Sequence, residues 1–265
     1  MYRLKKVFKK NTHNSFFKAL AGFGRSLNRL YENRNHDINC NGELSVIKKL
    51  SQTNPSVLID GGANIGNYSK ILSHYNPHAT VYAFEPVKDT FDKLVDQTKE
   101  HKNIIPRNEG FFSENLKKTI NLYKSHTLSS LYDIEGVSYQ PEETTEIKLI
   151  KGDDFVSGEN IEVIDFLKLD LEGAEFDALE GFENCLKQKR IKVIQFEYGY
   201  INITTKKLLI DYYNFFEALG YKIGKAFPKT VEFRKYETKY EDFLGPNFIA
   251  VDKNETHIID LLENK

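Results

Sequence analysis

The sequence predicts an α/β fold with a doubly wound, mostly parallel sheet, an antiparallel C-terminal strand and an N-terminal helical extension. Short apolar runs alternate with segments of helical period, which is the βα rhythm of a parallel sheet covered on both faces. The first apolar run, 57–59, leads into Asp60-Gly61-Gly62-Ala63-Asn64-Ile65-Gly66, an acid and a glycine cluster typical of a strand that turns into a helix beside a ligand. The last apolar runs predict closing strands, of which we expect the final pair to be antiparallel.

The individual elements follow from the same periods. After the first strand, the apolar runs predict further strands at 80–85, 103–107, 163–169, 192–196, 221–223, 230–233 and 248–251. These strands end near an acid, a proline or a basic residue. Predicted helices are 43–50, 67–74, 88–99, 174–186 and 206–219. Residues 109–150 interrupt the rhythm, because strand-like runs 119–123 and 146–150 are separated by polar loops around 125–130 and 135–143. We expect an inserted hairpin or edge structure near the site.

Composition limits the domain organisation and the partners. A chain of 265 residues, 40% hydrophobic and with a net charge of −1, suits one domain and an extension. We expect an extension at 1–50, the ligand-binding domain at 51–253, a tail at 254–265 and no nucleic-acid partner. Cys40 and Cys185 lie far apart with no Cys/His cluster, which argues against a disulfide framework or a thiolate metal site and favours a reducing cytoplasm. We see no bilayer-spanning or signal segment.

The N-terminal extension is basic and amphipathic. Residues 1–31 hold eight Lys and Arg and no acid. An apolar stripe recurs at steps of four and three, as in a helix, although Gly22 and Gly24 weaken it; its members are Phe16, Leu20, Phe23, Leu27 and Leu30. The stripe can pack on the domain with the basic face in water, or present a surface to anionic lipid or an acidic partner. We expect packing on the domain or a partner, and at most peripheral membrane contact that salt screens.

The glycine turn favours one nucleotide-like ligand over another. A dinucleotide-binding turn needs G-x-G-x-x-G, and from Gly62 that pattern would place Asn64 and Asn67 where glycines are required. The sequence instead fits D-x-G-x-N-x-G and resembles motif I of class I S-adenosylmethionine (SAM) methyltransferases. That resemblance implies that Asp60 faces the methionine amino group, and that the turn with Gly62, Asn64 and Gly66 makes room for the ligand.

Further candidate cofactor residues follow two neighbouring strands. Glu85 ends the second strand, where a carboxylate accepts hydrogen bonds from the two ribose hydroxyls. Asn108 and Glu109 follow the third strand, where methyltransferases commonly read the adenine ring; their alternative role is to cap a turn.

A second informative stretch is Lys168-Leu169-Asp170-Leu171-Glu172-Gly173-Ala174-Glu175. A lysine in an apolar strand, followed by three carboxylates, is costly to bury without a use. Glu172 and Glu175 can alternatively cap the next helix, and Lys168 can simply pair with a neighbouring acid. Glu197 ends the fifth strand beside the same crevice. We take Asp170, Glu197, Glu172 and Lys168 as candidate catalytic residues.

Four segments together resemble the FkbM family of SAM-dependent methyltransferases. They are LIDGGANIG, AFEP, DFLKLDLEGAE and VIQFE, in this order between about residues 57 and 200. The Asn41-Gly42-Glu43 lead-in is similar to that of members tied to sugar modification, whereas Gly152-Asp153-Asp154-Phe155 lacks the leucine usual before its first aspartate. The resemblance implies SAM as cofactor and O-methylation of a hydroxyl on a small-molecule or glycan acceptor.

The chemistry leaves alternatives open. The acceptor oxygen must be held in line at about 3 to 3.5 Å, and Asp170 or Glu197 could take its proton. A divalent cation could instead lower the acceptor pKa, although the sequence shows no third ligand beside these two acids. Two other functions remain: a SAM-binding protein without activity, and a nicotinamide oxidoreductase.

Overall fold

The computed structural model describes residues 8–10, 12–123, 129–132 and 141–264. Its central sheet has eight strands in the order β11-β10-β12-β9-β8-β1-β2-β3. Their bounds are β1 Val57–Gly61, β2 Thr80–Phe84, β3 Ile104–Arg107, β8 Ile164–Leu169, β9 Ile191–Glu197, β10 Tyr221–Phe227, β11 Thr230–Phe233 and β12 Asn247–Asp252. The neighbouring strands β3, β2, β1, β8 and β9 pair in parallel, whereas β12 runs antiparallel to both β9 and β10. The predicted fold class is confirmed.

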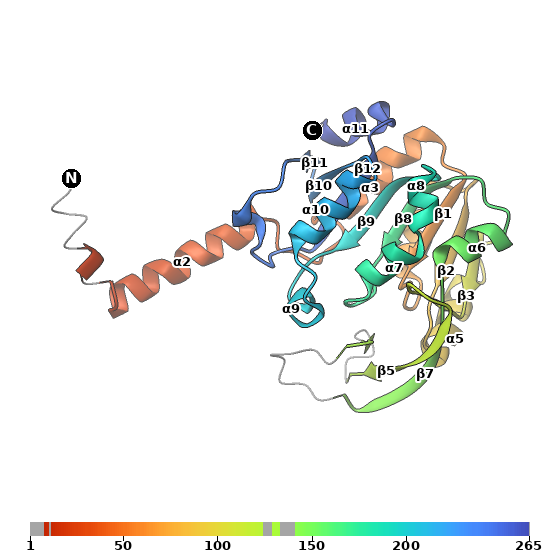
Figure 1. Cartoon of the computed structure of the whole chain (residues 1–265), viewed down its shortest axis with the longest axis horizontal. Coiled ribbons are helices and arrows are strands. Elements are labelled where there is room, and N and C mark those ends of the chain that lie inside the picture. Colours follow the sequence, from red (N-terminus) through yellow and green to blue (C-terminus); the bar gives the residue numbers. More distant parts are fainter. Residues whose placement is uncertain (1–7, 11, 124–128, 133–140, 265) are drawn as a thin grey trace.

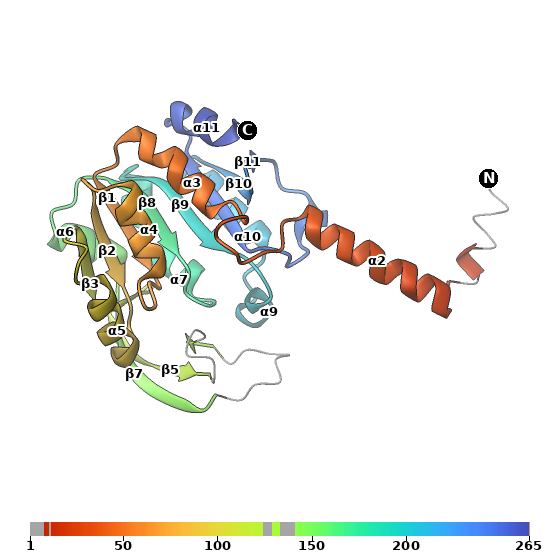
Figure 2. The same cartoon turned by 180° about the vertical axis from the view of Figure 1, so that it is seen from behind.

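Helices cover both faces of this sheet (Figures 1 and 2). One core cluster includes buried side chains of α6 Gly152–Gly158, α7 Glu175–Gly181, α8 Glu183–Lys187 and α10 Leu209–Ala218. The other includes those of α3 Glu43–Leu50, α4 Asn67–Tyr75, α5 Lys88–Thr98 and α11 Thr256–Glu263. The described residues also form the short helix α9 Ile201–Thr205 and two 3₁₀ helices, Ser51–Thr53 and Thr238–Tyr240. Apolar runs in the strands are therefore buried from two sides.

Several predicted elements and boundaries need correction. The expected helix 174–186 is two helices that meet at Phe182, and the expected helix 206–219 begins only at Leu209, because Lys206 ends α9 with a left-handed φ of 58°. The closing strands 230–233 and 248–251 do not pair, since β10 lies between them. Both ends of the domain are longer than expected, because α3 and α11 bury apolar side chains in the core, among them Val46, Ile47, Ile258 and Leu262.

The described residues between 110 and 150 form a second, smaller sheet in the order β4-β7-β5-β6. Its strands are β4 Gly110–Phe111, β5 Leu116–Leu122, β6 Ser129–Ser130 and β7 Glu143–Ile150, and β5 pairs antiparallel to β7. Figure 1 shows this pair extending from the main sheet beside the carboxyl ends of β1 and β2. The inserted hairpin is thus present, while most of the loops expected at 125–130 and 135–143 fall outside the described residues.

The basic helix is formed, but it does not pack on the domain. α2 Ser15–Tyr31 begins at Asn14, whose side chain accepts a hydrogen bond from Phe17 N at 3.0 Å, and none of its residues is buried. Figures 1 and 2 both show it projecting away from the sheet. The apolar stripe is exposed, so the expectation of packing on the domain is wrong, whereas packing on a partner stays a prediction. No helix in the described part of the chain is long and apolar enough to cross a bilayer.

Candidate active site

The glycine turn after β1 approaches the end of β8 very closely. Gly62 and Gly66 have φ of 82° and 86°, and Asn64 has φ of 49°, so the turn lies in the left-handed region that glycine tolerates. A Cβ added to Gly62 would lie 1.9 Å from the carbonyl oxygen of Asp170, and Asp170 N donates to Gly61 O at 3.0 Å. The small residues therefore allow the two strand ends to form one continuous wall.

Asp60 lies fully buried beneath this turn. Its Oδ2 accepts a hydrogen bond from Ser69 Oγ of α4 at 2.6 Å, and its Oδ1 lies 3.8 Å from Lys168 Nζ. Burial raises the pKa of Asp60, against the opposing effect of Lys168. Oδ1 accepts no hydrogen bond in the described structure, and an orphaned carboxylate oxygen at this depth is costly. A cationic donor would satisfy it.

Glu85 follows β2 and is held in one orientation. Its Oε1 accepts from Val87 N at 2.9 Å and its Oε2 from Asn64 N at 3.1 Å, so the carboxylate links the glycine turn to the start of α5. The side chain is buried, and burial raises its pKa to about 7 despite these two hydrogen bonds. Both oxygens keep acceptor capacity for a ligand with paired hydroxyls.

A hollow opens between this carboxylate and the inserted sheet. Its apolar lining comes from β5, β7 and the segments after β2 and β6, namely Pro86, Ile120, Leu131, Ile147 and Leu149. Its polar lining comes from the turn and the end of β8, namely Gly62, Asn64, Glu85, Asp170 and Glu172. We call it the first hollow; an apolar slot with one oriented carboxylate suits a nucleoside.

A second hollow lies on the other side of the turn and shares Gly62, Asn64, Asp170 and Glu172 with the first. Its further lining combines Ile38, Ile65 and Ile71 with polar side chains, namely His36, Asn41, Glu43, Tyr68, Lys168 and Glu197. It continues through His36, Glu172 and Glu197 into an aromatic mouth formed by Arg34, Tyr198, Tyr200, Phe243 and nearby residues. Two differently lined hollows thus meet at the end of β8.

Lys168 organises the acids at this junction. Its Nζ donates to Asp170 Oδ2 at 2.8 Å, and it sits 4.6 Å from the ring centre of Tyr68. Burial opposes its charge, but Asp170 and Asp60 outweigh burial and raise the pKa of Lys168, which therefore stays protonated. Lys168 is only 5% exposed, whereas Asp170 is 33% exposed into the hollows. The lysine positions Asp170, and Asp170 is the group that a ligand can reach.

Glu172 and Glu197 complete the acidic wall. Glu172 has a left-handed φ of 50°, a strained conformation for a residue other than glycine. Burial, with Asp170 and Glu175 nearby, raises the pKa of Glu172 to about 8. Burial and the same neighbouring acids raise the pKa of Glu197, at the end of β9, well above its usual value. Glu175 itself accepts from Leu171 N at 2.8 Å and Gly173 N at 3.0 Å, so it fixes the strained loop.

Comparison with known proteins identifies the family. The model of the methyltransferase FkbM domain matches residues 60–223, which contain the turn, the second strand end and the acidic junction. The chain belongs to the FkbM methyltransferase family.

Individual proteins of known name or structure are at most 30% identical to this chain among those compared below. The hexuronic acid methyltransferase AglP of Haloferax volcanii is 30% identical over 178 residues, covering 64% of this chain and 69% of the relative. Methyltransferase 1 of Beauveria bassiana is 25% identical over 147 residues, covering 49% of this chain and 59% of that protein. A crystal structure of an FkbM methyltransferase from Methylobacillus flagellatus is 16% identical with a TM-score of 0.47, covering 74% of this chain and 43% of that one. The chain thus spans between about two fifths and two thirds of these proteins' lengths.

The site of this FkbM family chain fits the cofactor that the sequence resemblance implies. SAM carries a sulfonium and an ammonium, and Asp170, Glu172 and Glu197 line the second hollow, while Asp60 lies fully buried and lines neither hollow. The apolar side chains and the Glu85 carboxylate of the first hollow suit its nucleoside part. The described residues contain no group of three or more His, Cys, Asp and Glu arranged to hold a metal ion.

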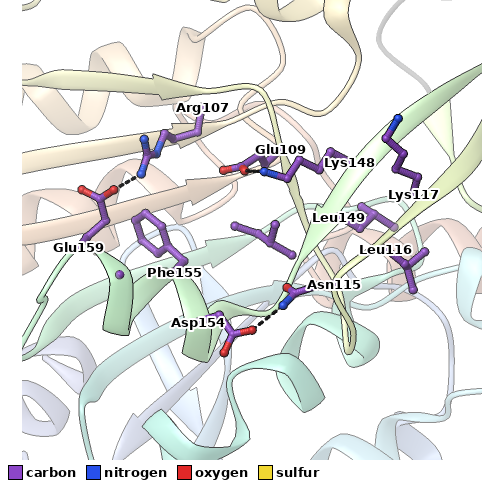
Figure 3. A pocket seen from close by; sticks show the side chains of 12 residues that line it. Arg107, Glu109, Asn115, Leu116, Lys117, Lys148, Leu149, Asp154, Phe155 and Glu159 are labelled. Atoms are coloured by element: carbon purple, nitrogen blue, oxygen red, sulfur yellow. Dashed lines mark hydrogen bonds and ion pairs between the residues drawn. The ribbon is translucent and has the colours of Figure 1, made fainter.

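Four predicted cofactor residues line neither hollow: Asp60 and Gly66 face the core beneath the turn, and Asn108 and Glu109 lie farther away. Asn108 Nδ2 donates to the carbonyl oxygens of Glu85 and Pro86 at 2.9 and 3.1 Å, so it braces the second strand end and does not line the first hollow. Glu109 pairs with Lys148 at 2.5 Å and lines another hollow, which is bordered by β3, β5, β7 and α6 and shares only Leu149 with the first hollow (Figure 3). These placements favour structural roles for Asn108 and Glu109.

Sequence reasoning missed a buried polar network below the second hollow. Glu43 Oε1 accepts from Gln195 Nε2 at 2.7 Å, Glu43 Oε2 accepts from Asn41 Nδ2 at 2.6 Å, and Tyr68 OH donates to Gln195 Oε1 at 3.2 Å. Glu43 was visible only as part of the Asn41-Gly42-Glu43 lead-in. Gln195 stood inside an apolar strand, VIQFE, and a buried glutamine there is a signal that could have been used.

Proposed function

We propose that the protein is a SAM-dependent O-methyltransferase that acts on a hydroxyl of a carbohydrate-type acceptor. One observation carries this proposal: a hollow lined by apolar side chains and the Glu85 carboxylate, and a second hollow lined by several acids, share the wall formed by Gly62, Asn64, Asp170 and Glu172. A methyl donor in the first hollow and an acceptor in the second would therefore meet at Asp170. The family of the chain supports the same reaction type.

The cofactor, when bound, supplies a methyl group that its sulfonium has already activated for transfer. Glu85 would hold its ribose, and the acids of the junction, with the charge of Asp60 buried beneath the turn, would attract its ammonium and sulfonium. The chain itself needs to align the acceptor oxygen and remove its proton. Asp170 is placed for this role, because Lys168 fixes its carboxylate at the shared wall while one third of the side chain stays accessible.

Glu172 and Glu197 have a different part in the proposal. The pKa of Glu172, raised to about 8, keeps this side chain largely protonated near neutral pH in the ligand-free protein, so it can donate a hydrogen bond to an acceptor oxygen as well as accept one. Glu197, whose pKa is also raised by burial and the neighbouring acids, adds a second carboxyl group to this wall. Hydroxyl-rich ligands suit such a wall. Asp170 is the base in this scheme.

Three features favour a sugar as acceptor. The mouth beyond the second hollow presents the rings of Tyr200 and Phe243, behind which Tyr198 is buried, and aromatic faces are common platforms for sugar rings. The Arg34 guanidinium stacks 4.6 Å from the ring centre of Tyr200, and no acid among the described residues pairs with it, so it can bind an anionic sugar substituent. The relative at 30% identity is named as a hexuronic acid methyltransferase.

The test is to incubate the enzyme with SAM and a panel of glycosides of glucuronic acid and glucose, and to measure the demethylated product S-adenosylhomocysteine (SAH). We expect SAH formation that depends on a sugar, with a lower KM for acidic sugars. Arg34→Ala should raise that KM about tenfold while kcat changes little, and the exposed, remote Lys102→Ala should change neither. If no sugar raises SAH formation above that of Asp170→Asn, the proposed acceptor class is refuted.

A further inference from the structure

The projecting helix α2 has an exposed apolar face that the catalytic site does not explain. All of its residues are accessible, and its large apolar side chains are strongly exposed: Phe16 69%, Leu20 52%, Phe23 62%, Leu27 49% and Leu30 78%. At 100° per residue around the helix axis, Phe17 and Tyr31 both fall beside this stripe, on the same flank of it. The apolar arc is therefore wider than the narrow apolar seam of a coiled coil. Such a surface in contact with water is unfavourable and indicates a partner.

The charge of the helix points to the nature of that partner. Lys18, Arg25 and Arg29 fall opposite the apolar arc, and the described residues from Phe8 to Tyr31 include no acid. Aromatic and leucine side chains on one face with lysine and arginine on the other are typical of helices that lie in the interface of an anionic bilayer. The field of an anionic surface extends about 8 Å in physiological salt, a distance comparable to the helix diameter.

A second copy of the helix is a poorer partner for this surface. The strict four-three spacing of the stripe covers only about two heptads, whereas stable coiled coils need roughly three or four. Gly22 and Gly24 lower the helix propensity within that span. The positions flanking the stripe hold Phe17, Ala19, Gly24 and Ser26, which provide no interhelical ion pairs.

The connection to the domain gives the helix a fixed relation to the site. Glu32, directly after α2, is buried and pairs with Lys225 at 3.0 Å and with Arg234 at 3.6 Å. Asn33 donates to Asn41 O at 2.7 Å and to Ala226 O at 2.9 Å. The chain then passes Arg34 and His36 in the wall of the aromatic mouth. Whatever α2 binds is therefore held close to the entrance of the second hollow.

We propose that α2 is a peripheral anchor that places the mouth of the site against an anionic membrane surface. This inference is independent of the methyl-transfer chemistry. It rests on the exposed apolar arc, the acid-free basic face and the rigid attachment at Glu32 and Asn33. It predicts attachment without insertion across the bilayer, because the polar face must remain in water.

The experiment is co-sedimentation of the full chain with vesicles of phosphatidylcholine, alone or mixed with phosphatidylglycerol. We expect binding to the mixed vesicles only, and release at high salt. Arg25→Glu reverses one charge on α2 and should weaken partitioning by on the order of tenfold or more, since each cation contributes about a fivefold factor. Lys93→Glu reverses an exposed charge on α5 of the domain and should have less than about a twofold effect.

Phe23→Ser tests the apolar face separately and should also weaken binding by on the order of tenfold. Circular dichroism and thermal unfolding of each variant show whether the fold is kept. Equal binding to both vesicle types, or none to either, would overturn the proposal. Light scattering that shows a dimer of the wild type and a monomer of Phe23→Ser would assign the apolar arc to a second copy and would equally overturn it.

Discussion

Replacing Glu85 by glutamine tests how the first hollow recognises its ligand. The carboxylate is buried, accepts from Asn64 N and Val87 N, and lines the apolar slot. Loss of its charge removes charge-assisted hydrogen bonds to a ribose, which contribute about 1.5 to 3 kcal/mol each. SAH affinity should therefore fall by roughly 10-fold to 100-fold, as measured by calorimetry at pH 8.

The pH dependence gives a second, independent magnitude for the same residue. Because the pKa of Glu85 is raised to about 7, the ionised form dominates at pH 8 and becomes the minor form at pH 6. If the ligand binds the ionised form, wild-type affinity should fall about tenfold between these pH values, and the variant should lack that part of the dependence.

Glu109→Gln is the matched control for Glu85→Gln. Sequence reasoning assigned both acids to the cofactor, but Glu109 pairs with Lys148 in a separate hollow (Figure 3). Its SAH affinity should stay within about twofold of wild type, as expected for loss of a largely exposed ion pair. Folded Glu85→Gln protein with unchanged affinity and the wild-type pH dependence would refute this account of the first hollow.

Three further predictions concern the junction. Asp170→Asn should lower turnover about 100-fold with little change in SAH affinity; loss of SAH binding with undiminished turnover at saturating SAM would reassign it to the cofactor. Gly62→Ala should lower the free energy of unfolding by more than about 1 kcal/mol in urea titrations, because its Cβ would meet Asp170 O at 1.9 Å. Gly158→Ala is the control and should not destabilise the protein, because the space around its Cβ is open. Equal urea midpoints of the two variants would contradict this. The pKa values of Glu172 and Glu175, about 8 and about 7, mean that the folded state binds more protons than the unfolded one, so ligand-free thermal stability should fall between pH 6 and 8.5; a rise would contradict it.

The fold could be predicted largely because local signals agreed with the tertiary arrangement. The apolar strands carry acids at their carboxyl ends, and parallel pairing of β1, β2 and β8 brings those ends together. The strand order alone therefore indicates that Glu85, Asp170, Glu172 and Glu197 lie at one edge of the sheet, where they line the two adjoining hollows, with Asp60 buried beneath them. The insertion could be predicted as a hairpin, but its role as the apolar wall of the first hollow depends on tertiary packing.

The errors have physical causes of the same kind. α2 has a clear helical pattern, but periodicity does not say what an apolar stripe contacts, and here the domain leaves it exposed. Asn108 and Glu109 follow the expected strand, yet the short connection to β4 turns Asn108 toward the carbonyl of Glu85 and Glu109 toward Lys148. Glu43 and Gln195 lie 152 residues apart and meet only through the packing of α3 against the sheet.

The most direct test of the central claim is to follow the methyl group itself. The enzyme is supplied with SAM labelled with ¹³C in the methyl group and with the most active sugar acceptor, and the product is examined by heteronuclear NMR. The account predicts a methyl ether whose carbon correlates with a sugar ring proton, formed with one SAH for each methyl transferred, and lost in Asp170→Asn. Labelled methyl on a nitrogen, or a carboxyl ester that alkali removes, or SAH released without a methylated sugar, would contradict methyl transfer to a carbohydrate hydroxyl.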